Sequence, residues 1–434
     1  MRRTEYVSRL GRNAWATVAF LLSAVALVGS AGCGSSNETG APDSGAGEAS
    51  GVRVEAGTSR DAKTADAIPE DGSDDSATDS GTDSGTDSGS FSCPSDDGGD
   101  QLPTDLRCTG LYSDWDSKTV ASDLIPYAPG YLLWSDGALK QRWAYFPPGT
   151  KIDNSNLDEW TFPVGTTFYK QFSFGSLRIE TRIFKKVSAS AGTAIPWVWA
   201  TYRWSADGSS SATMLDEGEP NVNGTTYEIP SHGACPECHQ GRLDYNMGFD
   251  AINLGASTAQ GVSLATLNEK KLLTVAVPST LEIPDDGTGL ARPSIGWLHS
   301  NCGVACHNRN SIAEASITGL FLRVSASLLV AEAGTVQASD LDTLKTAVWV
   351  PPTLPQFTNA GYYYLKPGDP TFSLIPTLDG SRGDPNTPQM PPIISHQVDT
   401  TDVSALRNWI AAMPTDGGPP SGADSGVDGA ADAE

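Results

Sequence analysis

The chain is poor in basic residues. It has 28 lysines and arginines against 52 aspartates and glutamates, which gives a formal net charge of −24. This imbalance argues against nucleic acid as a partner, because phosphate backbones select clusters of Lys and Arg. Most of the excess lies in two segments: 16 acidic and three basic residues between 34 and 100, and five acidic residues between 415 and 434. The acidity therefore says little about the part that folds.

Long apolar runs and common catalytic signatures are also missing. The most apolar stretch, residues 14–28, has 15 residues and is too short for a confident transmembrane helix. Residues 110–230 contain no Ser-His-Asp order, no phosphate-binding loop and no paired carboxylates in a convincing context. This region is therefore not predicted to be a catalyst.

Cysteine is scarce, with seven in the chain, yet two of them fall in the run CPECH at 235–239. C-x-x-C-H is the attachment motif of a c-type haem. Cys235 and Cys238 are spaced so that each thiol can add to one vinyl group of the same porphyrin. His239 can then supply an axial nitrogen to the iron. The run predicts a first covalent haem.

A second, wider copy follows in the run CGVACH at 302–307. Three residues separate Cys302 from Cys306, one more than in the usual motif, and His307 follows directly. This run predicts a second covalent haem, with His307 as its proximal ligand.

Further downstream, QMPP at 389–392 presents a thioether between prolines. Class I cytochromes offer their sixth ligand from such a loop, so Met390 is predicted to bind the second iron. For the first iron the sequence leaves several candidates open, namely Met247, His299 and His396. An iron without a sixth ligand is a further alternative, and it would turn an electron carrier into an enzyme.

Zinc is the main rival interpretation of the four motif cysteines. Four thiolates from Cys235, Cys238, Cys302 and Cys306 could form a tetrahedral zinc site. That site would not explain why a His follows each pair. Two local disulfides are a weaker alternative, because a bridge across two residues is strained or redox-active.

The beginning of the sequence is typical of an export signal. Four arginines precede the apolar residues 14–28, and the small residues SAG lead to Cys33 as in a bacterial lipobox. The chain is therefore predicted to be exported to the periplasm or outer membrane and anchored through a lipid on Cys33. An ordinary signal peptide cut nearby is the alternative. Haem c is attached outside the inner membrane, which agrees with export.

Composition divides the rest of the chain. Residues 34–91 are rich in Asp, Ser and Gly and are predicted to be a disordered tether, because they cannot bury enough apolar surface to fold. The other predicted parts are a β-rich module at 92–230, a di-haem region at 231–414 and an acidic disordered tail at 415–434. Cys93 and Cys108, with 14 residues between them, are predicted to form a disulfide in an oxidising compartment.

Local patterns give the predicted fold class. Residues 177–183 alternate apolar and polar side chains, and residues 197–204 form an aromatic run, both typical of strands. Residues 402–413 predict a closing helix, capped by Thr400 or Thr401. The expected architecture is a mainly-β N-terminal module followed by a mostly α, cytochrome c-like haem domain or domains.

An ordered string of short motifs resembles a group of bacterial di-haem c-type cytochromes with an N-terminal β module. The resemblance covers about 280 of the 434 residues, from Tyr131 to Ile410. The matching runs are LWSDGALK (133–140), FPPGT (146–150), FPVGT (162–166), ETR (180–182), IPS (229–231), CPECH (235–239), WLHSNC (297–302), KPGDP (366–370) and MPP (390–392). It implies haem binding and electron transfer.

These observations predict an exported electron-transfer protein with two haems c. Its partner would be a redox protein or a small-molecule electron donor or acceptor, and a lipid anchor would hold it to a membrane. The alternatives are a peroxidase- or oxidase-like di-haem enzyme with one open iron, or a zinc-stabilised surface binding module.

Overall fold

The computed structural model describes residues 91–93, 101–189, 195–415 and 418. The predicted signal peptide with Cys33, and nearly all of the predicted tether and tail, lie outside these residues. All described residues belong to one unit, Asp87–Glu434. Within them, no helix combines the length and the apolar character needed to cross a bilayer.

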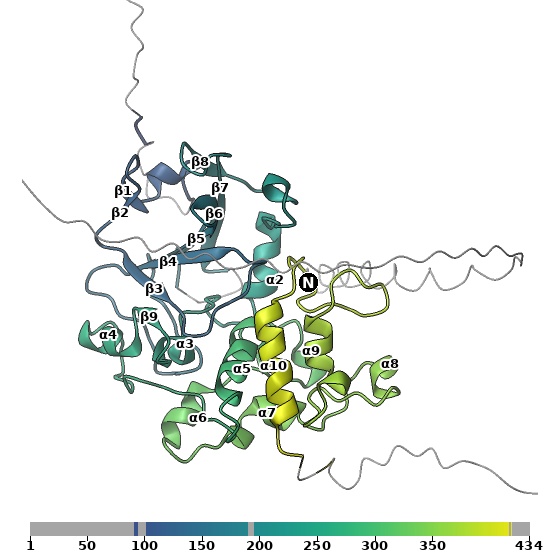
Figure 1. Ribbon diagram of the computed structural model, residues 1–434. Coiled ribbons are helices and arrows are strands. Elements are labelled where there is room, and N and C mark those ends of the chain that lie inside the picture. The colour runs from purple at the N-terminus through teal and green to yellow at the C-terminus, as the bar shows by residue number, and fades with distance from the viewer. Residues whose placement is uncertain (1–90, 94–100, 190–194, 416–417, 419–434) are drawn as a thin grey trace, which may run out of the picture. The chain divides into compact units, whose positions relative to one another are not determined.

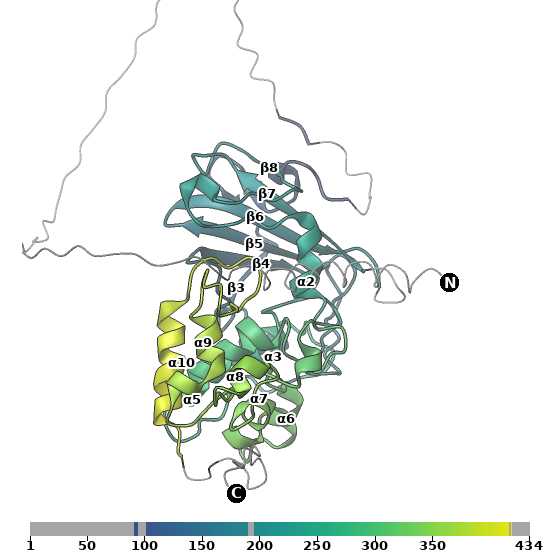
Figure 2. The ribbon, with the colours of Figure 1, turned by 90° about the vertical axis from the view of Figure 1, so that its right-hand side faces the viewer.

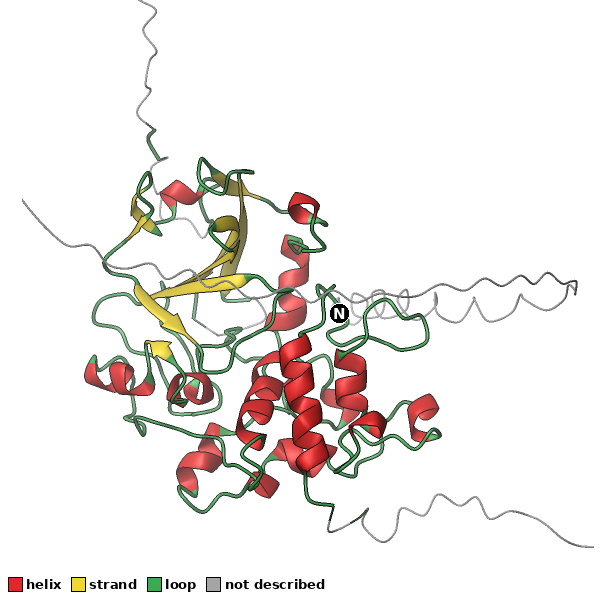
Figure 3. Cartoon of the chain, viewed as in Figure 1, coloured by secondary structure: helices red, strands yellow, loops and turns green. Residues whose placement is uncertain are grey.

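A seven-stranded antiparallel sheet organises this unit (Figures 1 and 3). Its strand order is β8-β7-β6-β5-β4-β3-β9, and a separate two-stranded sheet joins β1 and β2. The strands are β1 (Tyr112–Asp114), β2 (Thr119–Val120), β3 (Ile125–Ala128), β4 (Leu139–Tyr145), β5 (Thr167–Phe174), β6 (Leu177–Lys186), β7 (Trp197–Trp204), β8 (Ala212–Met214) and β9 (Gln260–Gly261).

The two faces of the sheet bury different sets of side chains, because successive residues of a strand point to opposite faces. Tyr169 on β5 and Ile183 on β6 pack in one cluster with Tyr202 and Trp204 of β7. Phe168 points the other way and joins the cluster that also contains most buried residues after position 249. The sheet is therefore covered on both faces.

The helices are short. They are α2 (Cys235–His239), α3 (Ala251–Gly255), α4 (Leu264–Glu269), α5 (Ala291–Leu298), α6 (Ala326–Ala331), α7 (Asp342–Ala347), α8 (Pro355–Thr358), α9 (Leu374–Asp379) and α10 (Thr400–Ala412). Among these described helices only α10, with 13 residues, exceeds eight. Figures 1 and 2 both place α2 beside the sheet and α5, α9 and α10 together, and Figure 2 shows α2 separated from α9 and α10.

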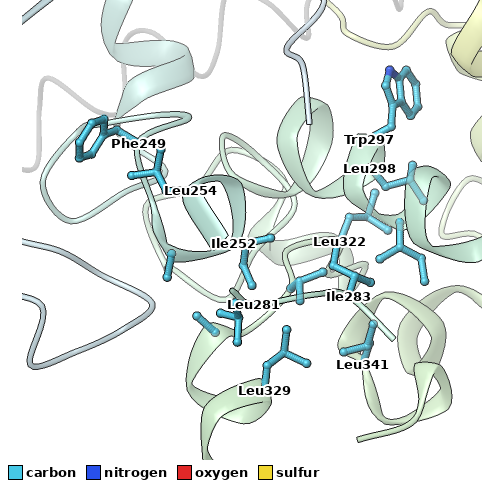
Figure 4. Packing of buried hydrophobic residues seen from close by; sticks show 14 of the residues in the cluster. Phe249, Ile252, Leu254, Leu281, Ile283, Trp297, Leu298, Leu322, Leu329 and Leu341 are labelled. Carbon is cyan, nitrogen blue, oxygen red and sulfur yellow. The ribbon is translucent and has the colours of Figure 1, made fainter. Parts of the chain in front are cut away.

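The prediction of a mostly α cytochrome c-like domain after the β module is wrong. Helices account for only 26% of the interpretable residues and strands for 18%, so long irregular segments dominate. One apolar cluster joins Phe168 and Trp197 of the sheet to Leu298 of α5 and Trp409 of α10. Figure 4 shows how Phe249, Leu281, Leu322 and their neighbours fill part of it.

The shared cluster explains how such short helices can be stable. Short isolated helices are marginal in water and depend on tertiary packing, and here the packing partner is the aromatic face of the sheet. Phe249 is 1% exposed and lies 5.3 Å, between ring centroids, from Phe168 of β5. The segments after residue 231 complete a core that the sheet begins.

The closing helix was predicted at nearly the right place, but with the wrong cap. α10 begins at Thr400, and the side chain of Asp399 accepts a hydrogen bond from the Asp402 backbone N–H at 3.2 Å. Val403, Leu406, Trp409 and Ile410 are buried on its inner face, as their spacing predicts.

Candidate functional site

The first cysteine pair lies within one helical turn. α2 consists of the motif itself, with Pro236 in its first turn, where the missing N–H costs nothing. Cys235 and Cys238 are free thiols and half-buried. Residues three apart share a helix face, so both thiols are presented on the same side, next to the imidazole of His239.

The imidazole of His239 is oriented for coordination through one nitrogen. Its Nδ1 lies 2.6 Å from the backbone oxygen of Tyr245, and its ring centroid lies 4.9 Å from that of Phe184. Metal-binding histidines typically donate one ring N–H to a carbonyl, which fixes the tautomer and leaves the other nitrogen for the metal. Burial, followed by the charge of Lys170, lowers the pKa of His239 to about 3, which keeps the ring neutral.

The loop after α2 is fixed to the sheet by a buried carboxylate. Asp244 accepts hydrogen bonds from Lys186 at 2.7 Å, from Trp197 Nε1 at 3.0 Å and from the Phe162 backbone N–H at 2.6 Å. The side chains of Lys186 and Asp244 are 1% and 3% exposed. Because Tyr245 follows directly, this network also positions the carbonyl that holds His239.

The second motif begins in a widened helical turn. α5 runs into a π-helical segment, His299–Gly303, in which Cys302 lies. The Cys302 carbonyl accepts from the backbone N–H groups of Cys306, at 3.1 Å, and His307, at 2.9 Å. Residues four apart also share a helix face. The extra residue between the cysteines is therefore compatible with two thiols on one side.

His307 is half-buried, and burial lowers its pKa. Its Nδ1 is buried and forms no hydrogen bond with any part of the chain that the structure describes. Unlike His239, it is not held by a carbonyl at that nitrogen. A hydrogen bond to the backbone of Leu320 opposes the lowering of its pKa.

The two motifs lie against each other. A Cβ built on Gly241 would lie 1.7 Å from the backbone oxygen of Ala305, inside the second motif. Asn310 Nδ2 donates to the Gly241 carbonyl at 3.3 Å, and Gln240 Nε2 donates to Glu314 Oε1 at 2.5 Å. The structure thus joins two segments that are more than 60 residues apart in the sequence.

His299 is buried and is held by the backbone through one ring nitrogen. Its Nδ1 accepts the Val324 backbone N–H at 3.0 Å, and its Nε2 lies 3.7 Å from Asp250 Oδ1. The ring is 1% exposed, and burial lowers its pKa. Nδ1 is therefore engaged by the backbone, whereas Nε2 faces the Asp250 carboxylate and has no hydrogen-bond partner among the described residues.

Asp250→Ala is expected to destabilise the protein by about 2 kcal/mol at pH 7. The carboxylate caps α3 through the Asn253 backbone N–H at 3.0 Å, and its loss leaves His299 facing an apolar gap. Burial opposes ionisation of Asp250, but His299, Arg242 and the Asn253 amide hold its pKa below the usual value. This contribution is present above pH 4 and is lost as the pH falls through the folded pKa.

Urea unfolding across pH 3–8 measures the difference in unfolding free energy between the wild type and Asp250→Ala. This difference should become smaller as the pH falls. The visible spectrum should stay unchanged. A changed spectrum would show that His299 does bind iron.

The remaining candidate ligands lie in different settings. His396 is 46% exposed and pairs with Glu228 at 2.7 Å. Met247 is half-buried in the loop that precedes Phe249. Met390 packs partly against the main cluster and lines a small cavity, of about 20 Å³, together with Cys302, Trp297 and Asp379. Of the three, only Met390 is brought beside a motif cysteine.

The cavity beside Met390 is polar at one end. Burial raises the pKa of Asp379 to about 7, and the nearby Arg382 only partly opposes this. Arg382 in turn donates to the Met390 carbonyl at 2.9 Å. This bond helps to hold the methionine loop in place.

Two further cysteine predictions concern structure. Cys93 and Cys108 form a disulfide, with their Cα atoms 5.4 Å apart. The zinc interpretation requires a cluster of metal-binding side chains. No cluster of three or more His, Cys, Asp or Glu side chains suited to a metal ion occurs among the described residues. The arrangement therefore gives no support to the four-thiolate zinc interpretation.

Sequence reasoning missed a row of cations on the sheet face beside α2. Arg142 of β4 pairs in register with Lys170 of β5, which pairs with Arg182 of β6. A signal was present: in the strand TFYKQFSF, Lys170 occupies the position between Phe168 and Phe172, where alternation predicts another apolar residue. A charge in such a position indicates a partner inside the fold.

The residues present fit a covalent haem at the first motif. Two half-buried thiols share one helical turn, a neutral His exposes one ring nitrogen, and the aromatic ring of Phe184 lies beside it. At the second motif the thiols, His307 and the Met390 loop supply the same donor types. Comparison with protein-family models, curated proteins and solved structures found no match to this chain.

Proposed function

We propose that the chain is a c-type cytochrome that binds two covalent haems and transfers electrons. The observation that carries the proposal is the packing of the segment just after the first motif on the second motif, at Gly241 and Ala305. Each motif brings two free thiols and a His, so their contact would keep two redox centres on neighbouring segments. The ordered resemblance to di-haem cytochromes supports the same proposal.

In this proposal the haems supply one-electron redox chemistry, and the protein holds and insulates them. Cys235 and Cys238 would hold the first haem and Cys302 and Cys306 the second. The Tyr245 carbonyl orients His239 and keeps its proton on Nδ1. Phe184 and the core around Trp297 limit access of water to the two motifs.

The cellular setting belongs to the same proposal. Export and a lipid on Cys33 would place the chain in the periplasm or at the outer membrane. A redox protein or a small-molecule donor or acceptor would then exchange electrons with it. The support is the signal-like pattern of residues 1–33 and the acidic, Ser- and Gly-rich segment that follows.

The full chain, expressed with a haem c maturation system, is expected to carry two haems. Intact mass and a pyridine haemochrome assay count them directly. Cys235→Ala with Cys238→Ala should leave one haem. The matched control, Cys93→Ser with Cys108→Ser, removes two cysteines outside the motifs and should leave two. A wild-type chain without attached haem would falsify the proposal, and one haem would exclude the wider second site.

A redox enzyme with an open first iron is the second candidate. The specific observation is that His299 Nδ1 accepts the Val324 backbone N–H, so one nitrogen of this candidate ligand is engaged elsewhere. A high-spin signal and carbon monoxide binding by the wild-type protein would favour the enzyme. Two low-spin irons would favour electron transfer.

A further inference from the structure

Three cations lie side by side on the sheet face beside α2. Arg142 is opposite Lys170, and Lys170 is opposite Arg182, on three neighbouring strands. Directly opposed side chains in a sheet have Cβ atoms about 5 Å apart, where like charges destabilise the pairing. We call Arg142, Lys170 and Arg182 the cationic row. Such a row needs negative charge nearby to be tolerated.

The protein neutralises only part of the row. Arg182 forms two hydrogen bonds to Glu180, at 2.6 and 2.8 Å, and Glu180 is fully buried. Within the described part of the chain, no hydrogen bond or ion pair is found for the side chains of Arg142 and Lys170. Arg142 is only 4% exposed, and Lys170 is half-buried. Leaving charges unpaired in such places is costly.

The electrostatic state of Lys170 reflects this shortage. Burial, and then the charges of Arg142 and Arg182, lower its pKa to about 7. Burial likewise lowers the pKa of Arg142. The carboxylates that the protein supplies therefore do not balance the row, and an anion beside it would be bound strongly.

The first motif lies over the row. Lys170 lies close enough to the Cys238 thiol, and Arg182 to the Cys235 thiol, for the charge of each cation to act on it. The neighbouring row of the same face is apolar and places Ala144, Phe168, Phe184 and Trp199 in register across four strands. Phe184 of this row contacts the ring of His239. An apolar row and a cationic row thus lie together beside two thiols and an imidazole.

A ligand that matches both rows is planar and apolar with carboxylates on one edge. Haem has this chemistry, because its macrocycle is apolar and its two propionates are anionic. Arg presents a rigid fork that matches a carboxylate, and Lys adds a compact point charge. The two propionates would therefore balance the charge of the cationic row without a further carboxylate from the protein.

We propose that the cationic row binds the propionates of the haem attached to Cys235 and Cys238. The proposal rests on the proposed function, since it needs a haem at that motif. It goes beyond it by assigning residues of the β strands, far from either motif in sequence, to the cofactor. It also makes the sheet part of the cofactor site rather than a separate module.

Lys170→Met and Arg142→Met, each in the full chain, are expected to lower one midpoint potential. A cation near the haem disfavours the oxidised, more positive state, so its removal favours oxidation. We expect at least a tenfold change in the reduction equilibrium, equivalent to about 59 mV for one electron. Spectroelectrochemical titration measures the shift, and intact mass confirms that haem is still attached.

Two variants serve as matched controls. Lys185→Met removes a cation from the opposite face of β6, the strand that carries Arg182, and should leave every potential unchanged. Lys170→Arg keeps the charge and should retain most of the wild-type potential. A haem-loaded Met variant with an unshifted potential would overturn the proposal while leaving the proposed function intact. A wild-type chain without haem at this motif would overturn both.

A second measurement covers variants that fold poorly. In the background Cys235→Ala with Cys238→Ala, which lacks the first haem, Lys170→Met removes an unbalanced buried charge and should raise the melting temperature. In the haem-loaded protein the same substitution removes a paired charge and should lower the melting temperature. If Lys170→Met changed the melting temperature in the same direction in both backgrounds, Lys170 would have a purely structural role and the proposal would be contradicted.

Discussion

Met390→Ala is expected to lower the midpoint potential of one haem by on the order of 100 mV or more and to create carbon monoxide binding. Met390 lines the same cavity as Cys302, and its backbone N–H donates to the Leu378 carbonyl at 3.1 Å. A thioether ligand raises a haem potential, so its loss lowers it and opens a position on the iron. Redox titration and carbon monoxide difference spectra measure both effects.

Two further variants sharpen this test. Met390→His should keep six ligands and still lower the potential. Met214→Ala is the matched control, because this methionine on β8 packs partly in the cluster on the other face of the sheet. It should cost stability without moving a potential. An unchanged spectrum and potential in Met390→Ala would assign Met390 to loop packing instead.

Gly241→Ala is expected to destabilise the protein by about 3 kcal/mol and to reduce haem loading at both motifs. The added Cβ would lie 1.7 Å from the Ala305 oxygen and 2.7 Å from its carbonyl carbon. These are backbone atoms, so no side-chain rotation relieves the clash. The segments carrying His239 and Cys306 must separate. Denaturant unfolding and haem counting measure the two effects.

Gly233→Ala is the matched control for Gly241→Ala. It lies two residues before Cys235, and a Cβ there would meet nothing within 4 Å. Its stability and haem content should equal those of the wild type. If Gly241→Ala behaved in the same way, the close contact between the motifs would not be required for either haem.

Local patterns predicted the local features of this fold well. The alternation in residues 177–183 and the aromatic run at 197–204 fall on β6 and β7, and the apolar spacing after Thr400 falls on α10. Each of these signals depends on neighbours within one element. The cap of α10 was missed because Asp399 and the two threonines are all residue types that cap helix N-termini.

The features that sequence could not provide are long-range. The pairing of Arg142 with Lys170 depends on strand register, and the contact of Gly241 with Ala305 depends on how two loops pack. His299 looked like a ligand because of its distance from Cys302 in sequence. Its hydrogen bond from Val324 became visible only in three dimensions. The predicted fold class was wrong for the same reason, because core sharing leaves no local signal.

The last strand of the sheet bears on how the protein avoids self-association during folding. β9 pairs with β3 through Tyr127 and Gly261, and only a glycine fits there, since a Cβ would lie 2.2 Å from the Pro126 oxygen. An uncovered strand edge is a template for another chain. During synthesis the edge of β3 stays unpaired until residue 261 has emerged. Cys235 and Cys238 emerge well before that point. The nascent chain is therefore most prone to self-association while its first pair of thiols is already exposed.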